Sequence, residues 1–378
     1  MNNIFRLISI VCAVAFLGAC TNIKPIDVDD QAQKELWEQR DKKKAEAEAK
    51  KKAENEANAK KIAEENEKNK QKYYAALREY KKTDHKLMFG WFSNWNPQSP
   101  DPVFNLDLLP DSVDFISNWG QQWDLSEAKK EQLKHAHERG IRMTIGWIIE
   151  NVGQGINAPE GGWLQWKKED GSVDVYKAID VYVASLCDSI QKYNYDGMDI
   201  DYEPSFASPF KNGNHCGDWG QDGDGLLALI SCSSSSNKER ENYFFTELRK
   251  GFDELEKKMD KKLMLNINGS ISWIDPQVAH LFDYFTAQSY NNSAGRWVNS
   301  LSRFGYGPEK LLVTETFQNK EGNANSFAKN YAVYANEKGI GGIGAFHINE
   351  DVIYGPNYKN VKEAIQIMNP ANTYTPEE

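Results

Sequence analysis

Runs of apolar and aromatic residues alternate with amphipathic segments from residue 86 to residue 368. Eight short runs have the length and composition of buried β-strands, and they span 86–95, 113–120, 141–149, 195–203, 262–270, 282–290, 310–318 and 342–349. Most of the segments between them have apolar residues at helical spacing, and the candidate helices span 125–139, 174–193, 237–260, 274–281, 293–304, 323–338 and 357–368. The pattern predicts strands and helices in alternation.

Alternating strands and helices form parallel βαβ units, and eight such units predict an α/β fold, the (β/α)8 TIM barrel. The crossover at 96–112 has no clear helical pattern and the element at 274–281 is short, so we expect the barrel to be somewhat irregular. A doubly wound open sheet is the competing architecture, but no GxGxxG follows the first strand to favour it.

A highly charged segment precedes the barrel. Residues 31–82 are nearly all Ala, Glu, Lys, Asn and Gln, with strong helix formers but almost no apolar stripe. Such a segment cannot bury a face against a core, and a coiled coil would need apolar a and d positions. We therefore predict a charged helical or disordered tether within 20–82, followed by the barrel domain at 83–378.

The N-terminus has the features of a secretory signal. Arg6 is followed by an apolar run at 7–16, which is too short to cross a membrane and has the proportions of a signal-peptide core. The following LGAC resembles the lipobox of bacterial lipoproteins, in which the peptide is cut before a lipid-bearing cysteine. This resemblance implies a signal peptide at 1–19 and lipidation of Cys20. An ordinary secretory signal that ends in Cys is the alternative.

Charge and cysteine content add to this interpretation. The net charge of −10 argues against a nucleic-acid partner. Cys216 and Cys232 lie in one long loop, where an oxidising compartment would allow a disulfide. No CxxC spacing suggests zinc, and we expect neither a metal nor a cofactor. We expect a monomer in the cell envelope, attached to the outer membrane only by its lipid anchor. The acidic residues that follow Cys20, at 27, 29 and 30, favour surface exposure.

The fourth strand candidate, YDGMDIDYEP at 195–204, is unusually acidic. Because strand side chains alternate, Asp199, Asp201 and Glu203 share one face, and the apolar set between them can pack against helices. Glu203 comes last and so lies nearest the C-terminal rim, where barrel active sites form. Asp196 has the opposite parity and opens the strand, so we assign it a structural role.

Burying like charges close together is costly unless some of the groups carry protons. A solvent-facing acidic edge strand would need exposed surroundings, yet this run lies among buried-type strands. Carboxylates could bind a divalent ion, but such sites usually recruit ligands from several strands. Sugar hydrolysis instead uses a carboxyl with a raised pKa beside a second acid. We therefore favour acid–base chemistry.

The stretch DGMDIDYE resembles the DxxDxDxE signature of glycoside hydrolase family 18, which includes chitinases and endo-β-N-acetylglucosaminidases. The resemblance extends over the strand pattern from 85 to 368. It implies that Glu203 is the general acid, that Asp201 holds the 2-acetamido group of the substrate, and that Asp199 pairs with Asp201. The acetamido oxygen would attack C1 to give an oxazolinium ion, and stereochemistry would be retained.

The sixth strand candidate ends in AQSYN, which places Gln288 and Tyr290 on one face. In endo-acting members of the family, a Gln and a Tyr at this strand end contact the acetamido group. An inward polar pair whose members satisfy each other is the alternative explanation.

Two departures from the family pattern bear on specificity. Chitinases carry SxGG on the third strand, where this chain reads TIGW. They usually have a Trp at the end of strand eight, where this chain reads GAFHINED, with His347 and Asn349. Absence of that Trp is closer to the endo-β-N-acetylglucosaminidases that act on N-glycans. We expect one of three tryptophans at strand ends to supply stacking surface: Trp91, Trp95 or Trp147.

The resemblance therefore implies an endo-β-N-acetylglucosaminidase that cleaves the GlcNAc-β1,4-GlcNAc bond of the N-glycan core, with N-glycans or glycoproteins as partners. A chitinase-type hydrolase is the second hypothesis. The third is an inactive glycan-binding barrel, which would be expected to lack the terminal Glu, whereas Glu203 is present. A metal-dependent carboxylate enzyme is a more distant alternative.

Overall fold

The structure is a computed structural model that describes residues 29–120, 122–149, 151–163, 165–170, 174–203, 235–290, 293–318, 324–354 and 357–371. The chain divides into two compact units, Met1–Gln71 and Lys72–Glu378. The signal segment 1–19, Cys20, and the long loop with Cys216 and Cys232 lie outside the described residues.

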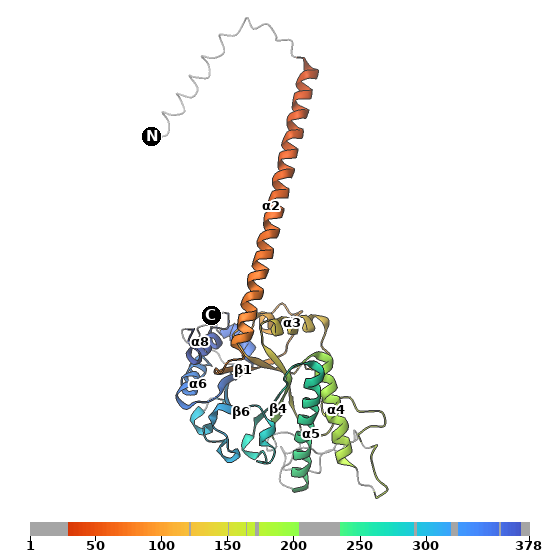
Figure 1. Cartoon of the computed structure of the whole chain (residues 1–378), viewed down its shortest axis with the longest axis vertical. Helices are drawn as coiled ribbons and strands as arrows, with labels where there is room; N and C mark the ends of the chain where they lie inside the picture. The colour runs from red at the N-terminus through yellow and green to blue at the C-terminus, as the bar shows by residue number, and fades with distance from the viewer. Residues whose placement is uncertain are drawn as a thin grey trace, which may run out of the picture. The chain divides into compact units, whose positions relative to one another are not determined.

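Eight parallel strands close into a barrel in sequence order, and β8 pairs with β1 (Figure 1). Their bounds are β1 (Leu87–Ser93), β2 (Phe115–Trp119), β3 (Arg142–Ile148), β4 (Gly197–Tyr202), β5 (Met264–Gly269), β6 (Phe285–Gln288), β7 (Leu311–Thr316) and β8 (Gly342–Phe346). Each strand lies inside one of the eight apolar runs, so the predicted (β/α)8 barrel is confirmed.

Helices surround this barrel, with bounds α3 (Glu127–Glu138), α4 (Val175–Tyr193), α5 (Ser235–Met259), α6 (Ala324–Lys338), α7 (Asp351–Tyr354) and α8 (Lys359–Met368). Ser126 caps α3 by accepting from Lys129 N, and Asp174 caps α4 by accepting from Lys177 N. The amphipathic pattern thus predicted α3, α4, α5, α6 and α8 to within a few residues.

Two predicted helices are wrong. The segments 274–281 and 293–304 form only short 3-10 turns, at Ala279–Leu281, Ala294–Trp297 and Ser302–Phe304. Pro276 interrupts the first segment and disfavours helical backbone at the residue before it. Gly295 and several Ser and Asn residues weaken the second. The crossover after β1 likewise has only the turns Pro102–Phe104 and Leu106–Leu108, so the expected irregularity is confirmed.

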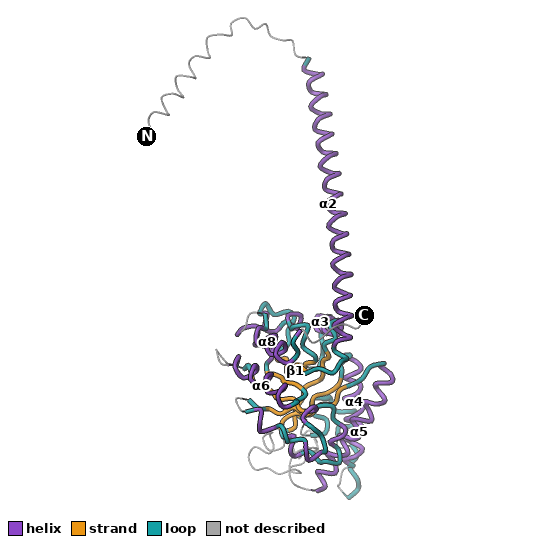
Figure 2. The backbone as a smooth tube through the Cα atoms, turned by 60° about the vertical axis from the view of Figure 1, so that its left-hand side comes forward, coloured by secondary structure: helices purple, strands orange, loops and turns teal. Residues whose placement is uncertain are grey.

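The charged segment is a single helix, α2 (Asp30–Tyr80), of 51 residues with none buried (Figure 2). The structure therefore favours the helical form of the predicted tether. Across the described parts of the chain, no helix combines the length and apolar character needed to cross a membrane.

Strand alternation divides the core into two shells. One apolar cluster fills the barrel interior and consists of Leu87, Phe89, Trp91, Phe115, Met264 and Leu312. The outward faces of the strands join a larger cluster with the helices. On β4 that outward set is Met198, Ile200 and Tyr202, all buried, which leaves the aspartates of β4 facing the interior.

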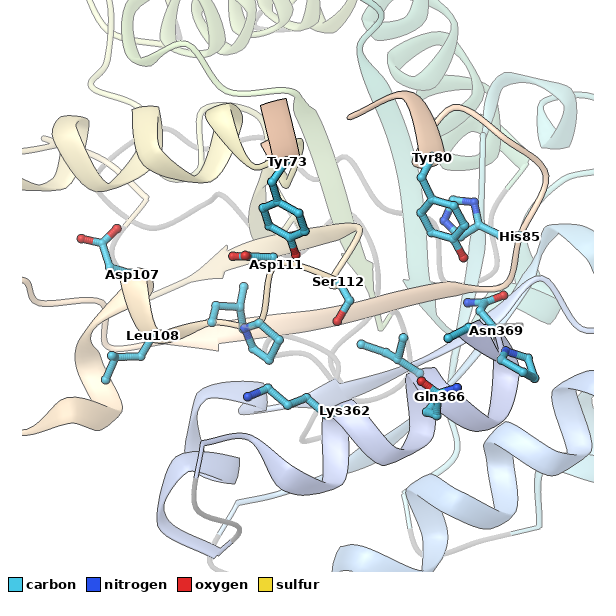
Figure 3. Close-up of a pocket in the computed structure, with 15 residues that line it drawn as sticks. Tyr73, Tyr80, His85, Asp107, Leu108, Asp111, Ser112, Lys362, Gln366 and Asn369 are labelled. Atoms are coloured by element: carbon cyan, nitrogen blue, oxygen red, sulfur yellow. The ribbon is translucent and has the colours of Figure 1, made fainter. Parts of the chain in front are cut away.

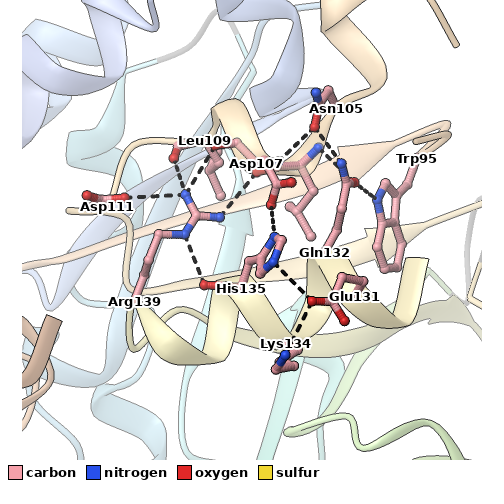
Figure 4. Close-up of polar contacts among 11 residues, drawn as sticks. Trp95, Asn105, Asp107, Leu109, Asp111, Glu131, Gln132, Lys134, His135 and Arg139 are labelled. Atoms are coloured by element: carbon pink, nitrogen blue, oxygen red, sulfur yellow. Dashed lines mark hydrogen bonds and ion pairs between the residues drawn. The ribbon is translucent and has the colours of Figure 1, made fainter. Parts of the chain in front are cut away.

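The long connection after β1 is held by side chains of α3 (Figure 4). The Arg139 guanidinium donates to Leu109 O at 2.7 Å. Gln132 Oε1 accepts from the Trp95 indole at 2.8 Å, and its Nε2 donates to Asn105 Oδ1 at 2.6 Å. These buried bonds replace the secondary structure that the connection lacks, since buried polar groups must be paired.

Candidate active site

Strand β4 places two aspartates inside the barrel and a glutamate at its rim. Asp199 is fully buried and Asp201 is 6% exposed. Glu203 follows the last residue of β4 and is half-buried. The period of two along a strand puts these three carboxyls in one row, here called the acidic line, which runs from the core to the C-terminal end of the barrel.

The innermost acid, Asp199, is held from across the barrel. The Trp91 indole Nε1 donates to its Oδ2 at 2.8 Å. Burial raises the pKa of Asp199 to about 6, although the polar side chains of Asn268, Ser117 and Trp91 favour the charged form and oppose the rise. Asp199 can therefore take up or release a proton near neutral pH.

The central acid, Asp201, contacts both neighbours in the line. Burial raises its pKa well above the ordinary value, and the charges of Glu203 and Asp199 raise it further. The Glu203 carboxyl lies close enough to Asp201 to favour the neutral form of Asp201 by its charge and by hydrogen bonding. Gln288 Nε2 donates to Asp201 Oδ1 at 3.0 Å. The raised pKa favours the protonated form of Asp201, directly beside the residue at the rim.

Gln288 and Tyr290 approach the acids from β6. Gln288 ends β6 and donates to Asp201 and to Asn268 Oδ1 (2.8 Å), so its amide is satisfied by groups other than Tyr290. Burial and the charges of the three acids raise the pKa of Tyr290. The phenol therefore lies in the field of the same acidic line, as expected for a residue of the site.

An aromatic group that the sequence analysis missed borders the acids. Phe346 ends β8, and its ring stacks on Tyr290 with centroids 5.9 Å apart. Trp91 and Trp119 meet the same ring edge-on at 6.1 and 6.3 Å. The inward parity of Phe346 at the end of the last strand was the available signal, because it is the strand-eight position nearest the rim.

The structure corrects the expectation for Trp91, which is 2% exposed and lies in the interior cluster. It has no free face for a sugar ring and instead binds Asp199. Trp95 is also buried, against α3, with its indole bonded to Gln132. Trp147 is half-buried and packs edge-on against Trp123, with centroids 5.9 Å apart. Of the three candidates, only Trp147 has part of its surface exposed.

Asn349 is a second correction. Its side chain is 1% exposed and bridges two backbone segments. Oδ1 accepts from Ser93 N at 3.0 Å, while Nδ2 donates to Ser93 O at 3.2 Å and to Val103 O at 3.1 Å. An amide whose donors and acceptor are used in this way supports the β1 connection and has nothing left for a substrate.

His347 follows Phe346 in a left-handed backbone conformation with φ of 55°. Its Nδ1 lies 2.9 Å from Glu350 Oε1, and its ring packs edge-on against Phe346 at 4.2 Å. Burial lowers the pKa of His347, and Glu350 opposes that shift. The structure places His347 beside the aromatic group of Phe346 and Tyr290. A contact between His347 and the substrate stays a prediction.

Asp196 lies at the opposite end of β4 from Glu203. Its Oδ2 accepts from Met143 N at 2.7 Å and lies 2.8 Å from His137 Nε2. Lys261 Nζ donates to its Oδ1 at 3.1 Å. These contacts join three segments of the chain at the N-terminal end of the barrel, far along the strand from the acidic line.

A cavity of about 740 Å³ also lies at the N-terminal end of the barrel (Figure 3). It is lined by the last turns of α2, the segment before β2 and the end of α8, including Tyr73, Tyr80, His85, Asp111, Lys362 and Asn369. Barrel active sites form at the other end, where the acids lie. Within the described residues, no group of three or more His, Cys, Asp or Glu side chains could hold a metal ion.

Comparisons with known proteins agree with this fold. A family model described as glycoside hydrolase family 18, BT1044-like, matches residues 44–218. The solved structure of a variant of the protein BT1044 is 27% identical, with a TM-score of 0.62 over 79% of this chain and 93% of that chain. No curated protein sequence matches the chain.

Two more distant structures share the fold. An endo-β-N-acetylglucosaminidase from Cordyceps militaris is 19% identical, with a TM-score of 0.52 over 79% of this chain and 95% of that chain. A Group II chitinase catalytic domain from Ostrinia furnacalis is 12% identical, with a TM-score of 0.51 over 78% and 98% of the two chains.

Proposed function

We propose that this chain is a member of glycoside hydrolase family 18 and an endo-β-N-acetylglucosaminidase that hydrolyses the GlcNAc-β1,4-GlcNAc bond of the N-glycan core. One observation carries the proposal. Asp201 lies between Asp199 and Glu203, has a pKa raised by burial and by the charges of both neighbours, and accepts a hydrogen bond from Gln288. This arrangement provides a proton donor at the rim and a charge-stabilising carboxylate directly beneath it.

The chemistry follows from the positions of these groups. Glu203 protonates the glycosidic oxygen as the bond to C1 breaks. The substrate's acetamido oxygen forms the new bond to C1, while Asp201 accepts from the acetamido N–H and stabilises the positive oxazolinium. Glu203, now ionised, takes a proton from the incoming water, which opens the oxazolinium with overall retention. Family 18 is an exception to the two-carboxylate spacing rules because the nucleophile belongs to the substrate.

The end of strand eight favours the N-glycan substrate over chitin. Phe346 and His347 occupy the place where chitinases usually carry a Trp, so the aromatic surface under the reacting sugar is smaller. A variant of the Cordyceps militaris enzyme, which shares the fold, has been solved with fucosyl-N-acetylglucosamine-Asn. We propose a glycan of this core type, on a glycoprotein, as the partner of this chain.

Product mass tests the proposal directly. The purified chain is incubated with a high-mannose and a complex-type N-glycoprotein, and the masses of the treated glycoproteins are measured by mass spectrometry. We expect one GlcNAc to remain per glycosylation site. Replacing Glu203 with Gln should lower kcat by about 10²- to 10⁴-fold, because general acid catalysis is lost. Cleavage of chitin oligomers alone would support the chitinase, and binding without any cleavage would support a glycan-binding barrel.

We further propose that Cys20 carries a lipid that anchors a monomeric enzyme at the outer membrane. The proposal rests on the LGAC sequence before the spacer. Expression of the full chain and its Cys20→Ser variant in a bacterium with an outer membrane tests it. The unaltered chain should sediment with that membrane, and the variant should appear in the soluble fraction. Equal distribution of the two proteins would contradict a lipid anchor.

A further inference from the structure

Strand β5 places an asparagine opposite each aspartate of β4. The strand register pairs Asp199 with Asn266 and Asp201 with Asn268. Both asparagines are 1% exposed and face the barrel interior. The mechanism given above assigns neither of them a role, although Asn268 lies at the same level as the carboxylate that must stabilise the oxazolinium.

Asn268 belongs to a chain of hydrogen bonds that ends on that carboxylate. Its Nδ2 donates to the backbone carbonyl of Ile200 at 3.1 Å. Its Oδ1 accepts from Gln288 Nε2 at 2.8 Å. The same Gln288 nitrogen donates its second hydrogen to Asp201 Oδ1 at 3.0 Å.

These hydrogen bonds allow only one orientation of the Asn268 and Gln288 amide groups. A backbone carbonyl can only accept, so Asn268 must turn Nδ2 toward Ile200 and Oδ1 toward Gln288. Since Oδ1 also can only accept, Gln288 must present Nε2 to it. A flipped Gln288 would bring its oxygen against Asn268 Oδ1 and the Asp201 carboxylate together. The orientation of the Gln288 amide is therefore set by two acceptors together, Asn268 Oδ1 and the Asp201 carboxylate, and Asn268 is the one that takes no part in the chemistry.

We propose that Asn268 is a positioning residue for the reaction, which acts through Gln288 to keep an N–H donor on Asp201. A donor to a carboxylate favours the ionised form, which is the form that stabilises the oxazolinium. The proposal rests on the proposed function. Its consequence is that loss of Asn268 impairs the chemical step and moves the ionisation of Asp201, while the substrate contacts at the rim remain.

The charged groups around Asp201 cannot replace the hydrogen bond that Gln288 donates to it. The titratable groups that face it are Asp199 and Glu203 from β4 and Tyr290 beyond β6, and each of these disfavours a second negative charge or is itself neutral. At this level β5 presents only asparagines. Gln288 is thus the hydrogen-bond donor whose contact to Asp201 the structure records, and its orientation matters accordingly.

The test compares two leucine substitutions in the full chain. Asn268→Leu removes the acceptor for Gln288 and keeps the branched shape of the side chain. Gln132→Leu breaks another buried amide network, between Trp95 and Asn105, that includes none of the three acids (Figure 4). We expect Asn268→Leu to lower kcat at least tenfold with KM within about threefold of the unaltered chain, in line with the loss of a hydrogen bond to a charged group. The acidic limb of the pH profile should move to higher pH.

Gln132→Leu should lower the thermal unfolding temperature but leave the pH profile unchanged. Asn268→Ala replaces Asn268→Leu if the latter does not fold, because it also removes the acceptor. If the Asn268 variants behave like Gln132→Leu, with reduced stability and an unshifted profile, the proposal is overturned.

A second measurement separates this inference from the proposed function. Titration of ¹³C-labelled aspartate carboxyls by NMR needs no substrate, and we expect the pKa of Asp201 to be higher in Asn268→Leu than in the unaltered chain. An unchanged titration would overturn the role of Asn268 even in an active enzyme. Inactivity of the unaltered chain on every glycan, together with a shifted titration, would reject the proposed function and retain the hydrogen-bond chain.

Discussion

The indole Nε1 of Trp91 on β1 donates to Oδ2 of Asp199 on β4, at 2.8 Å, inside the closed barrel. The two residues are 108 positions apart in the chain and come from strands that do not pair with each other. Trp91 thereby holds Asp199, the innermost of the three acids. Phe346 and Tyr290 provide the aromatic surface nearest the rim.

Trp91→Phe should impair activity through Asp199. The substitution keeps an aromatic ring in the interior cluster but removes the N–H donor. Burial already raises the pKa of Asp199 to about 6, and loss of the donor should raise that pKa further. A hydrogen bond to a charged group contributes about 1.5–3 kcal/mol, so we expect kcat to fall about tenfold or more. Kinetics and ¹³C titration of the variant check this, and an unchanged Asp199 titration would contradict it.

Asp199→Asn should stabilise the protein above pH 6 while it reduces activity. Because the folded pKa of about 6 lies above the unfolded value, the contribution of Asp199 to stability is present below the unfolded pKa and is lost as pH rises through 6. The neutral amide avoids that loss, which is about 3 kcal/mol for a pKa that rises from about 3.9 to about 6.

Thermal unfolding at pH 4 and pH 8 measures this difference. The variant should gain stability relative to the unaltered chain at pH 8 and show little gain at pH 4. A variant whose relative stability is the same at both pH values would show that the Asp199 carboxyl is not destabilised by its burial. A buried charge retained at such a cost is typical of functional sites.

Asp196→Ala should unfold the barrel more easily without changing the chemistry. Burial alone would raise the pKa of Asp196, but the bonds and charges of His137 and Lys261 and the Met143 N–H outweigh it, so that the pKa is lowered. Its contribution to stability is therefore present above the unfolded pKa and is lost as pH falls through the folded pKa. Removing one partner of a buried ion pair costs about 3 kcal/mol or more.

Denaturant unfolding at pH 7 should show this loss, with kcat per folded molecule unchanged. Asp196→Asn keeps an acceptor for Met143 N and should lose less stability than the alanine variant. A large fall in kcat for either variant, at full folding, would assign Asp196 a part in the reaction that its position at the far end of β4 does not suggest.

Much of the fold could be predicted from the sequence because its signals are local. The eight apolar runs, their separation by amphipathic segments and the period of two on β4 each depend on a few neighbouring residues. They were enough to predict the barrel and the inward face of Asp199 and Asp201. The helices expected at 274–281 and 293–304 were wrong because Pro276 and Gly295, together with short connections, outweighed a weak periodicity.

The contacts around the acids were decided by the tertiary structure alone. Alternation shows which face of a strand a side chain occupies, but barrel closure and strand register decide what it meets there. Trp91 was expected at the rim and lies beneath Asp199, and Asn349 was expected at the substrate and bridges Ser93 to Val103. By itself the sequence determined that Asp199, Asp201 and Glu203 follow one face of the fourth strand. The side chains that donate hydrogen bonds to these acids, Trp91 and Gln288, come from strands distant in the chain. Only the closed barrel brings them together.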